Sequence, residues 1–134
     1  MGSEPGSSRE GEYLRVEIAG DSEAAGRARR AIGRLRTDLD PPTVESMRLL
    51  ITELVTNSVR HAQAPLIEMA VAVSKDDVRV EIANPGGGFE AKPSGPEDSD
   101  SGWGLFLVDR LASEWGVDDA AGGYQRVWFE MARA

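Results

Sequence analysis

The sequence contains no cysteine, one histidine and no long hydrophobic run. Without cysteine there is neither a disulfide framework nor a thiolate metal site, which is compatible with a reducing cytoplasm. No apolar stretch approaches the ~20 residues that a membrane helix needs, and no signal-peptide pattern opens the chain, so we expect a cytoplasmic protein with no membrane partner. Basic residues are few, and the net charge of −8 argues against direct nucleic-acid binding.

The chain does have enough apolar residues for one hydrophobic core. Its 134 residues are 40% hydrophobic, which fits a single domain of ordinary size. Residues 1–12 are small, polar and aperiodic, as is typical of a disordered N-terminal tail. We therefore expect a single domain over residues 13–134.

Hydrophobic periodicity predicts five strands and three helices. Alternating apolar residues predict strands over 13–19, 65–74, 77–84, 114–119 and 124–132, and a period near 3.6 predicts helices over 21–39, 40–62 and 102–112. The last four strands form two consecutive hairpins, which favours a mixed but mostly antiparallel sheet. With the helices covering one face, the fold class is α+β, a two-layer α/β sandwich.

The long helix over residues 40–62 carries a carboxylate and an amide one turn apart, Glu53 and Asn57. An amide oxygen is a hard ligand suited to Mg²⁺, which takes few protein ligands and is completed by substrate phosphates and water. The carboxylate is suited to act as a base. The same spacing also occurs in plain surface pairs, so it does not identify a site by itself.

The strand over residues 77–84 ends in Asn84, which shares the parity of the strand's apolar residues and so points toward the core. A polar side chain with that direction needs a hydrogen-bonding partner. Pro85 then ends the ladder, and Gly86 and Gly88 allow the backbone to approach a ligand closely. A tight turn with an incidental asparagine is the simpler alternative.

A third stretch places Gly102 and Gly104 at the start of a helix. Unpaired backbone amides at a helix N-terminus are suited to bind phosphate. Simple loop flexibility explains the two glycines equally well when they are taken alone.

Taken together and in this order, the three stretches resemble the motifs of the GHKL (Bergerat-fold) ATPase superfamily, which includes gyrase, histidine kinases and MutL. "ELVTNSVRHA" is similar to its N-box, "NPGGG" to its D-x-G-x-G box and "GWGLFLV" to its G-x-G-L box. Chain length and the glutamate before the N-box asparagine make the chain most similar to the anti-sigma-factor serine/threonine kinases of bacterial partner-switching systems. The resemblance covers roughly residues 13–131.

The resemblance implies ATP and Mg²⁺ as cofactors and assigns each motif a role. Glu53 would be the catalytic base, Asn57 would hold the Mg²⁺, and residues 89–101 would form the lid over the nucleotide. The resemblance places the nucleotide against Asn57, Asn84, Gly86, Gly88, Gly102, Gly104 and Leu105. The only histidine, His61, lies within the N-box, so the chain offers no separate phosphoacceptor of a histidine autokinase.

By the same resemblance, the chain is a protein serine kinase that binds a sigma factor and phosphorylates a serine of an anti-anti-sigma protein of the STAS type. A homodimer is the family's usual form. The alternative is a non-catalytic partner-binding module of the same fold, with weakened or lost nucleotide binding. The retained Glu53 favours the kinase, because a pure binder has no need of a base.

Two positions depart from the family pattern. Asn84 stands where the family has an aspartate that accepts a hydrogen bond from the adenine amino group. Its oxygen can still accept that bond without the charge, which predicts weaker ATP binding, and its nitrogen, if turned inward, could face the O6 atom of guanine. Arg126 stands where the late strand usually has a threonine. Both departures favour the alternative.

Three arginines, Arg27, Arg30 and Arg34, recur at helical spacing in the helix predicted over 21–39. They are most simply a solvated face. In an acidic protein, a local basic stripe is also suited to dock an acidic partner, and both interpretations stay open.

Overall fold

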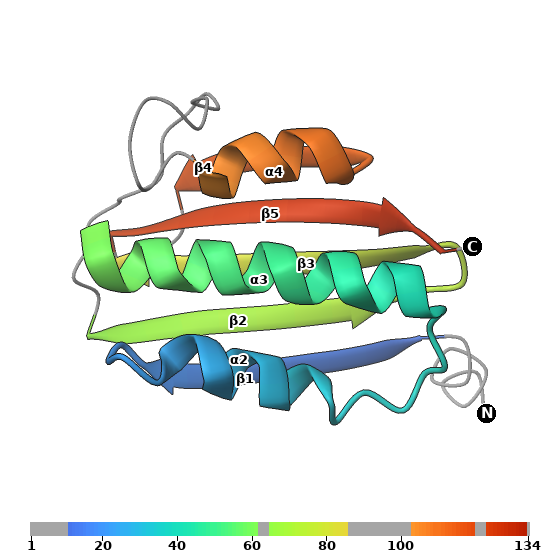
Figure 1. Cartoon of the computed structure of the whole chain (residues 1–134), viewed down its shortest axis with the longest axis horizontal. Coiled ribbons are helices and arrows are strands. Elements are labelled where there is room, and N and C mark those ends of the chain that lie inside the picture. The colour runs from blue at the N-terminus through green and yellow to red at the C-terminus, as the bar shows by residue number, and fades with distance from the viewer. Residues whose placement is uncertain (1–10, 62–64, 86–102, 120–122, 134) are drawn as a thin grey trace.

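The computed structural model describes residues 11–61, 65–85, 103–119 and 123–133. In chain order, its elements are β1 (Glu12–Ala19), α2 (Ala24–Ile32), α3 (Pro41–His61), β2 (Leu66–Val73), β3 (Asp77–Pro85), α4 (Trp103–Leu111), β4 (Glu114–Asp119) and β5 (Tyr124–Ala132) (Figure 1). β1 starts one residue earlier than predicted, and residues 1–10 of the expected tail lie outside the described residues. Among the described helices, none is both long and apolar enough to cross a membrane.

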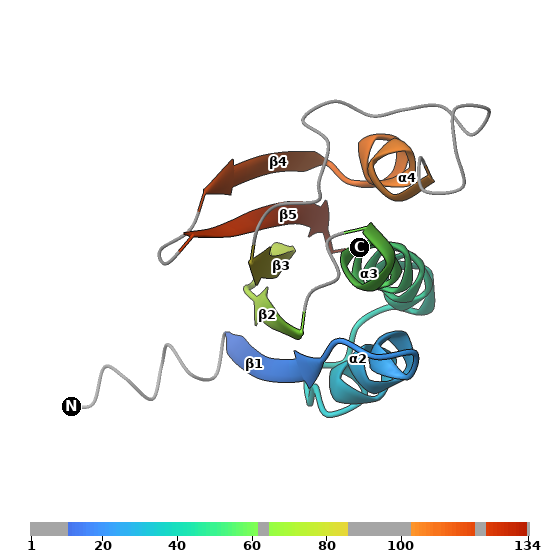
Figure 2. The ribbon, with the colours of Figure 1, turned by 90° about the vertical axis from the view of Figure 1, so that its left-hand side faces the viewer.

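The five strands form one sheet in the order β1-β2-β3-β5-β4, and all four pairings are antiparallel. The three helices lie together on one face of this sheet, and no described helix covers the other face (Figure 2). The β4–β5 hairpin joins the sheet through β5, which pairs with β3 and leaves β4 at the edge. The α+β two-layer class predicted from the sequence is therefore confirmed, but the five described strands pair only antiparallel, so the expectation of a mixed sheet is wrong.

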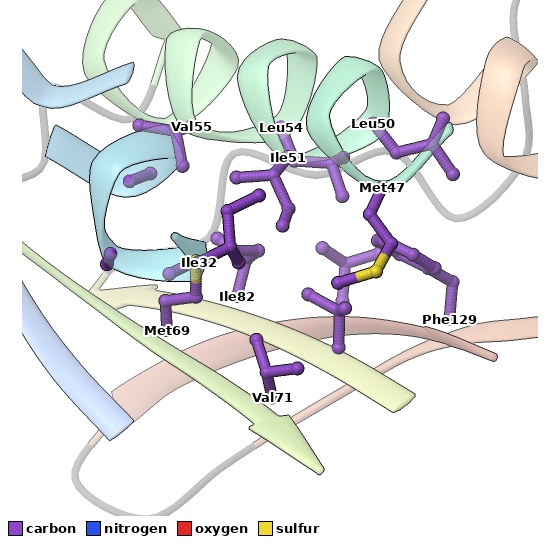
Figure 3. Close-up of a cluster of buried hydrophobic side chains, with 14 of the residues drawn as sticks. Ile32, Met47, Leu50, Ile51, Leu54, Val55, Met69, Val71, Ile82 and Phe129 are labelled. Atoms are coloured by element: carbon purple, nitrogen blue, oxygen red, sulfur yellow. The ribbon is translucent and has the colours of Figure 1, made fainter. Parts of the chain in front are cut away.

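The core lies between α3 and the middle of the sheet, because both elements turn a wide apolar face inward (Figure 3). Every second residue of β2 is buried, in keeping with the two-residue period of a strand. The largest completely buried side chains are Phe129, Met47, Leu50, Ile51, Leu54, Ile67, Met69 and Ile82. Each such side chain contributes about 1.5–3 kcal/mol by leaving water. Much of α3 is thus fixed against the sheet.

The start of α3 is set by Asp40. Its carboxylate accepts hydrogen bonds from the backbone N–H of Thr43 at 3.2 Å and from the Thr43 hydroxyl at 2.7 Å. A side-chain acceptor before the first turn satisfies amides that have no partner within the helix. Pro41 and Pro42 fill first-turn positions where an N–H is not needed.

The first helix is shorter than predicted. α2 ends at Ile32, whereas the apolar pattern extended it to Leu39. Leu35 and Leu39 do pack against the core, but they do so from the irregular connection between α2 and α3. Apolar spacing alone could not separate these two arrangements.

Glu12 holds that connection in place. Its carboxylate accepts hydrogen bonds from the backbone N–H groups of Arg36 and Thr37 and, at 2.6 Å, from the Thr37 hydroxyl. The Thr37 hydroxyl, followed by the Arg36 amide, holds the pKa of the Glu12 carboxyl below its usual value. The start of β1 is thereby tied to the segment that leads into α3.

The three arginines do not form one helical stripe. Arg34 lies beyond the end of α2, and Arg27 donates to the Asp21 carboxylate at 2.7 Å. That hydrogen bond raises the pKa of Arg27 and lowers the pKa of Asp21. Arg30 remains as an exposed basic residue on the helix.

Candidate active site

The described parts of the three sequence motifs lie at one end of the fold. α4 runs antiparallel to α3 (Figure 1). In keeping with this direction, Leu111 at the end of α4 and Ser46 near the start of α3 line the same hollow. The C-terminal end of α3, the end of β3 and the start of α4 therefore lie together, at the left of Figure 1. The site is thus assembled from two helix ends and one strand end.

Asn84 occupies the inward-facing position predicted for it. Its side chain is completely buried, and its Nδ2 donates to the Ser58 hydroxyl oxygen at 2.8 Å. Ser58, itself 1% exposed, donates in turn to the carbonyl oxygen of Leu54 at 3.0 Å. One partner of the buried amide is thus a hydroxyl of α3, one residue after Asn57.

Glu53 and Asn57 are half-buried and one turn apart on α3. Helical spacing puts both on the same side of α3 as Ser46, the residue that shares a hollow with α4. This side differs from the one that buries Leu54 and Ser58 under the helix. Among the described residues, Glu53 takes part in no ion pair, so its carboxylate is not committed to a structural role.

The glycine motifs are described only in part. Gly86, Gly88, Gly102 and the segment 89–101 expected to form the lid lie outside the described residues. Gly104 and Leu105 are in the first turn of α4. Their predicted contacts with a nucleotide therefore stay predictions.

The strand next to Asn84 corrects one expectation. Gln125, not Arg126, is paired with Asn84 across β3 and β5, and it shares the parity of the buried residues of β5. Arg126 has the opposite parity and donates to Asp118 at 3.0 Å, with Glu81 at 3.8 Å. It therefore lies on the helix-free face of the sheet, where it cannot weigh against binding at Asn84.

That helix-free face carries a row of paired charges. Arg79 bonds Glu81 and Glu130, both at 3.0 Å, and its guanidinium lies 4.2 Å from the Trp128 ring centre. Burial opposes the charge of Arg79, but the two carboxylates outweigh it and raise its pKa. A hollow of about 440 Å³ lies nearby over Ala70 and Ala83. These groups are separated from Asn84 by the sheet and belong to a different surface.

Comparison with known proteins identifies the fold family. The model of the histidine kinase-like ATPase domain matches residues 18–130. The chain belongs to this family. The match includes all three motifs and the strands and helices that carry them, and it confirms the GHKL resemblance.

Two relatives show which members of the family this ATPase domain resembles. The serine-protein kinase RsbW of Oceanobacillus iheyensis is 23% identical over 129 residues, covering 83% of this chain and 82% of that protein. The crystal structure of the RsbU and RsbW domains of Rv1364c from Mycobacterium tuberculosis superposes with a TM-score of 0.65 at 19% identity. The superposition covers 91% of this chain but only 32% of that longer one. The domain is thus similar to RsbW-type kinases.

Sequence reasoning missed two residues of the site, Ser58 and Gln125. Ser58 lies inside the N-box stretch, but nothing in the sequence says which strand passes beneath it. Gln125 could have been found by counting back in twos from Val127 and Phe129, since all three share one face of β5.

Proposed function

We propose that the protein is an ATP-dependent serine kinase that binds a sigma factor and phosphorylates a STAS-type antagonist of it. The observation that supports the proposal is the pair Glu53 and Asn57, both half-buried and one turn apart on the side of α3 that faces α4. The serine-protein kinase named among its relatives supports the same reaction.

In this reaction, catalysis comes mainly from positioning and from neutralising charge. ATP with Mg²⁺ supplies the phosphoryl group to be transferred and the positive charge that offsets it. The Asn57 amide oxygen fits as a hard ligand for such an ion, because one amide beside substrate phosphates and water is a common Mg²⁺ environment. Among the described residues there is no cluster of three or more acidic, histidine or cysteine side chains, so the fit rests on this single donor.

Glu53 takes the proton of the attacking serine hydroxyl. It lies one turn before Asn57, so a base and a ligand of the phosphate-bound ion share one side of the helix. Its freedom from ion pairs with the described residues leaves its oxygens able to accept that proton. The expected assembly is a cytoplasmic homodimer.

The test combines binding with phosphate transfer. Mg-ATP is titrated by calorimetry, and the protein is then incubated with radiolabelled ATP and purified STAS-domain proteins from the same genome. We expect ATP binding and label on a serine of one STAS protein. Binding without transfer to any of them would contradict the kinase assignment.

One observation favours a second function, a non-catalytic partner-binding module. Asn84 lacks the charge of the family's aspartate, and charge-assisted hydrogen bonds are about twice as strong as neutral ones. If the protein captures its sigma factor but binds no nucleotide at millimolar ATP, this second function holds.

A further inference from the structure

Two hydrogen bonds form a directed chain in the buried interior beside the candidate site. It runs from the Asn84 amide to the Ser58 hydroxyl at 2.8 Å, and from that hydroxyl to the carbonyl oxygen of Leu54 at 3.0 Å. The Asn84 side chain is completely buried and Ser58 is 1% exposed. Water is therefore a poor substitute for either bond.

The direction of this chain follows from the atoms available. A serine hydroxyl has a single hydrogen, and Ser58 gives it to the Leu54 carbonyl. Ser58 must then meet Asn84 as an acceptor, and only the NH₂ group of the amide can donate to it. Turning the amide over would bring its oxygen against the hydroxyl oxygen, and one of the two bonds would be lost.

We propose that Ser58 is a positioning residue for base selectivity, because it holds Asn84 with the amide oxygen, and not the nitrogen, toward the nucleotide base. The inference rests on the proposed function, since it requires a nucleotide at Asn84. The sequence alone leaves both orientations of the Asn84 amide open, and Ser58 selects one of them.

The selectivity follows from the edges of the two bases. Adenine carries an amino group at C6, which donates to an amide oxygen. Guanine carries a carbonyl oxygen there, which would meet the Asn84 oxygen as a second acceptor. To bind guanine, the Asn84 amide must turn over and lose about one net hydrogen bond to Ser58. The protein is therefore expected to prefer ATP over GTP by about tenfold.

The first experiment titrates Mg-ATP and Mg-GTP into the wild type and into Ser58→Ala. The variant removes the Ser58 acceptor for Nδ2, so the turned orientation of Asn84 no longer loses that hydrogen bond. We expect the ratio of the GTP to the ATP dissociation constant to fall about tenfold, with most of the change in GTP binding. An unchanged ratio in Ser58→Ala, or a wild type that binds both nucleotides equally, would overturn the inference.

The second experiment repeats the comparison in Asn84→Asp. A carboxylate has two equivalent oxygens, so it has no orientation for Ser58 to set. We expect Ser58→Ala to change the ratio less than twofold in this background. A general packing defect would instead affect both nucleotides and both backgrounds alike, and that result also refutes a positioning role.

Melting temperatures of all four proteins confirm that they are folded. If Ser58→Ala does not fold, Ser58→Cys, which is similar in volume but a weak acceptor, is expected to lower the ratio in the same direction, and an unchanged ratio there would refute the inference. Failure of the wild type to bind either nucleotide would overturn the proposed function together with this inference. Normal ATP binding with an unaltered ratio overturns the inference alone.

Discussion

Replacing Glu53 by glutamine removes one charge from α3 and keeps the shape of the side chain. If Glu53 is the base, Glu53→Gln lowers phosphate transfer by ~10²–10⁴-fold, the usual contribution of a general base. This corresponds to about 2.7–5.5 kcal/mol in the activation free energy. The proton of the serine hydroxyl then has no acceptor at that position.

The structure predicts that the same change leaves the fold nearly unaffected. Glu53 is half-buried and makes no ion pair with a described residue, so no partner is left unpaired. The expected change in unfolding free energy is within about 0.5 kcal/mol. If Glu53 lies beside the phosphates as proposed, ATP binding is expected to be equal or slightly tighter, because the exchange removes a negative charge there.

The assay compares Glu53→Gln with the wild type and with Glu45→Gln. Glu45 is an exposed glutamate on the same helix, so its exchange makes an equal charge change away from the site. Single-turnover transfer of radiolabelled phosphate separates chemistry from product release. Unchanged transfer in Glu53→Gln, or an equal loss in Glu45→Gln, would refute the role of Glu53 as the base.

Three further predictions concern other parts of the molecule. Because the pKa of Glu12 is lowered in the folded state, its stabilising contribution is present above pH ~4.5 and is lost as the pH falls through its folded-state pKa. The difference in unfolding free energy between the wild type and Glu12→Gln should therefore vanish in acid, and a difference that stays constant with pH would contradict this. Gly116→Ala places a Cβ 2.8 Å from Nε1 of Trp128 and should cost about 1–3 kcal/mol in urea denaturation, whereas a neutral result would show that the ring can move freely. If the basic residues of α2 steer an acidic partner, Arg30→Glu should slow association and flatten its salt dependence in stopped-flow measurements, with no change in melting temperature; an unaltered rate would leave Arg30 as solvated surface.

The order of the elements could be predicted from the sequence because each strand and helix carries its own periodicity. Asn84 shows how far that reasoning extends. Two-residue alternation along β3 correctly placed its side chain in the core and required a partner. It could not name Ser58, because that contact depends on which part of α3 lies over the end of β3.

Two errors arose where local pattern and tertiary structure diverge. Leu35 and Leu39 extend the apolar spacing of α2, yet they reach the core from a connection that Glu12 ties down through Arg36 and Thr37. A contact between residues so far apart in sequence leaves no periodic signal. The role of Arg126 was inferred from the motif around it, whereas the two-residue alternation along β5 places its side chain on the helix-free face of the sheet.

The departure at Asn84 has a physical consequence that a simple loss of charge does not capture. The hydrogen bonds from Asn84 to Ser58 and from Ser58 to the Leu54 carbonyl need a donor at position 84. A carboxylate there would have to take the hydroxyl hydrogen away from Leu54, because it has none of its own to give. The amide therefore retains an acceptor oxygen and gains a fixed orientation, at the expense of charge. Asn84 and Ser58 are best regarded as one unit, and on this basis the asparagine is compatible with a working adenine site.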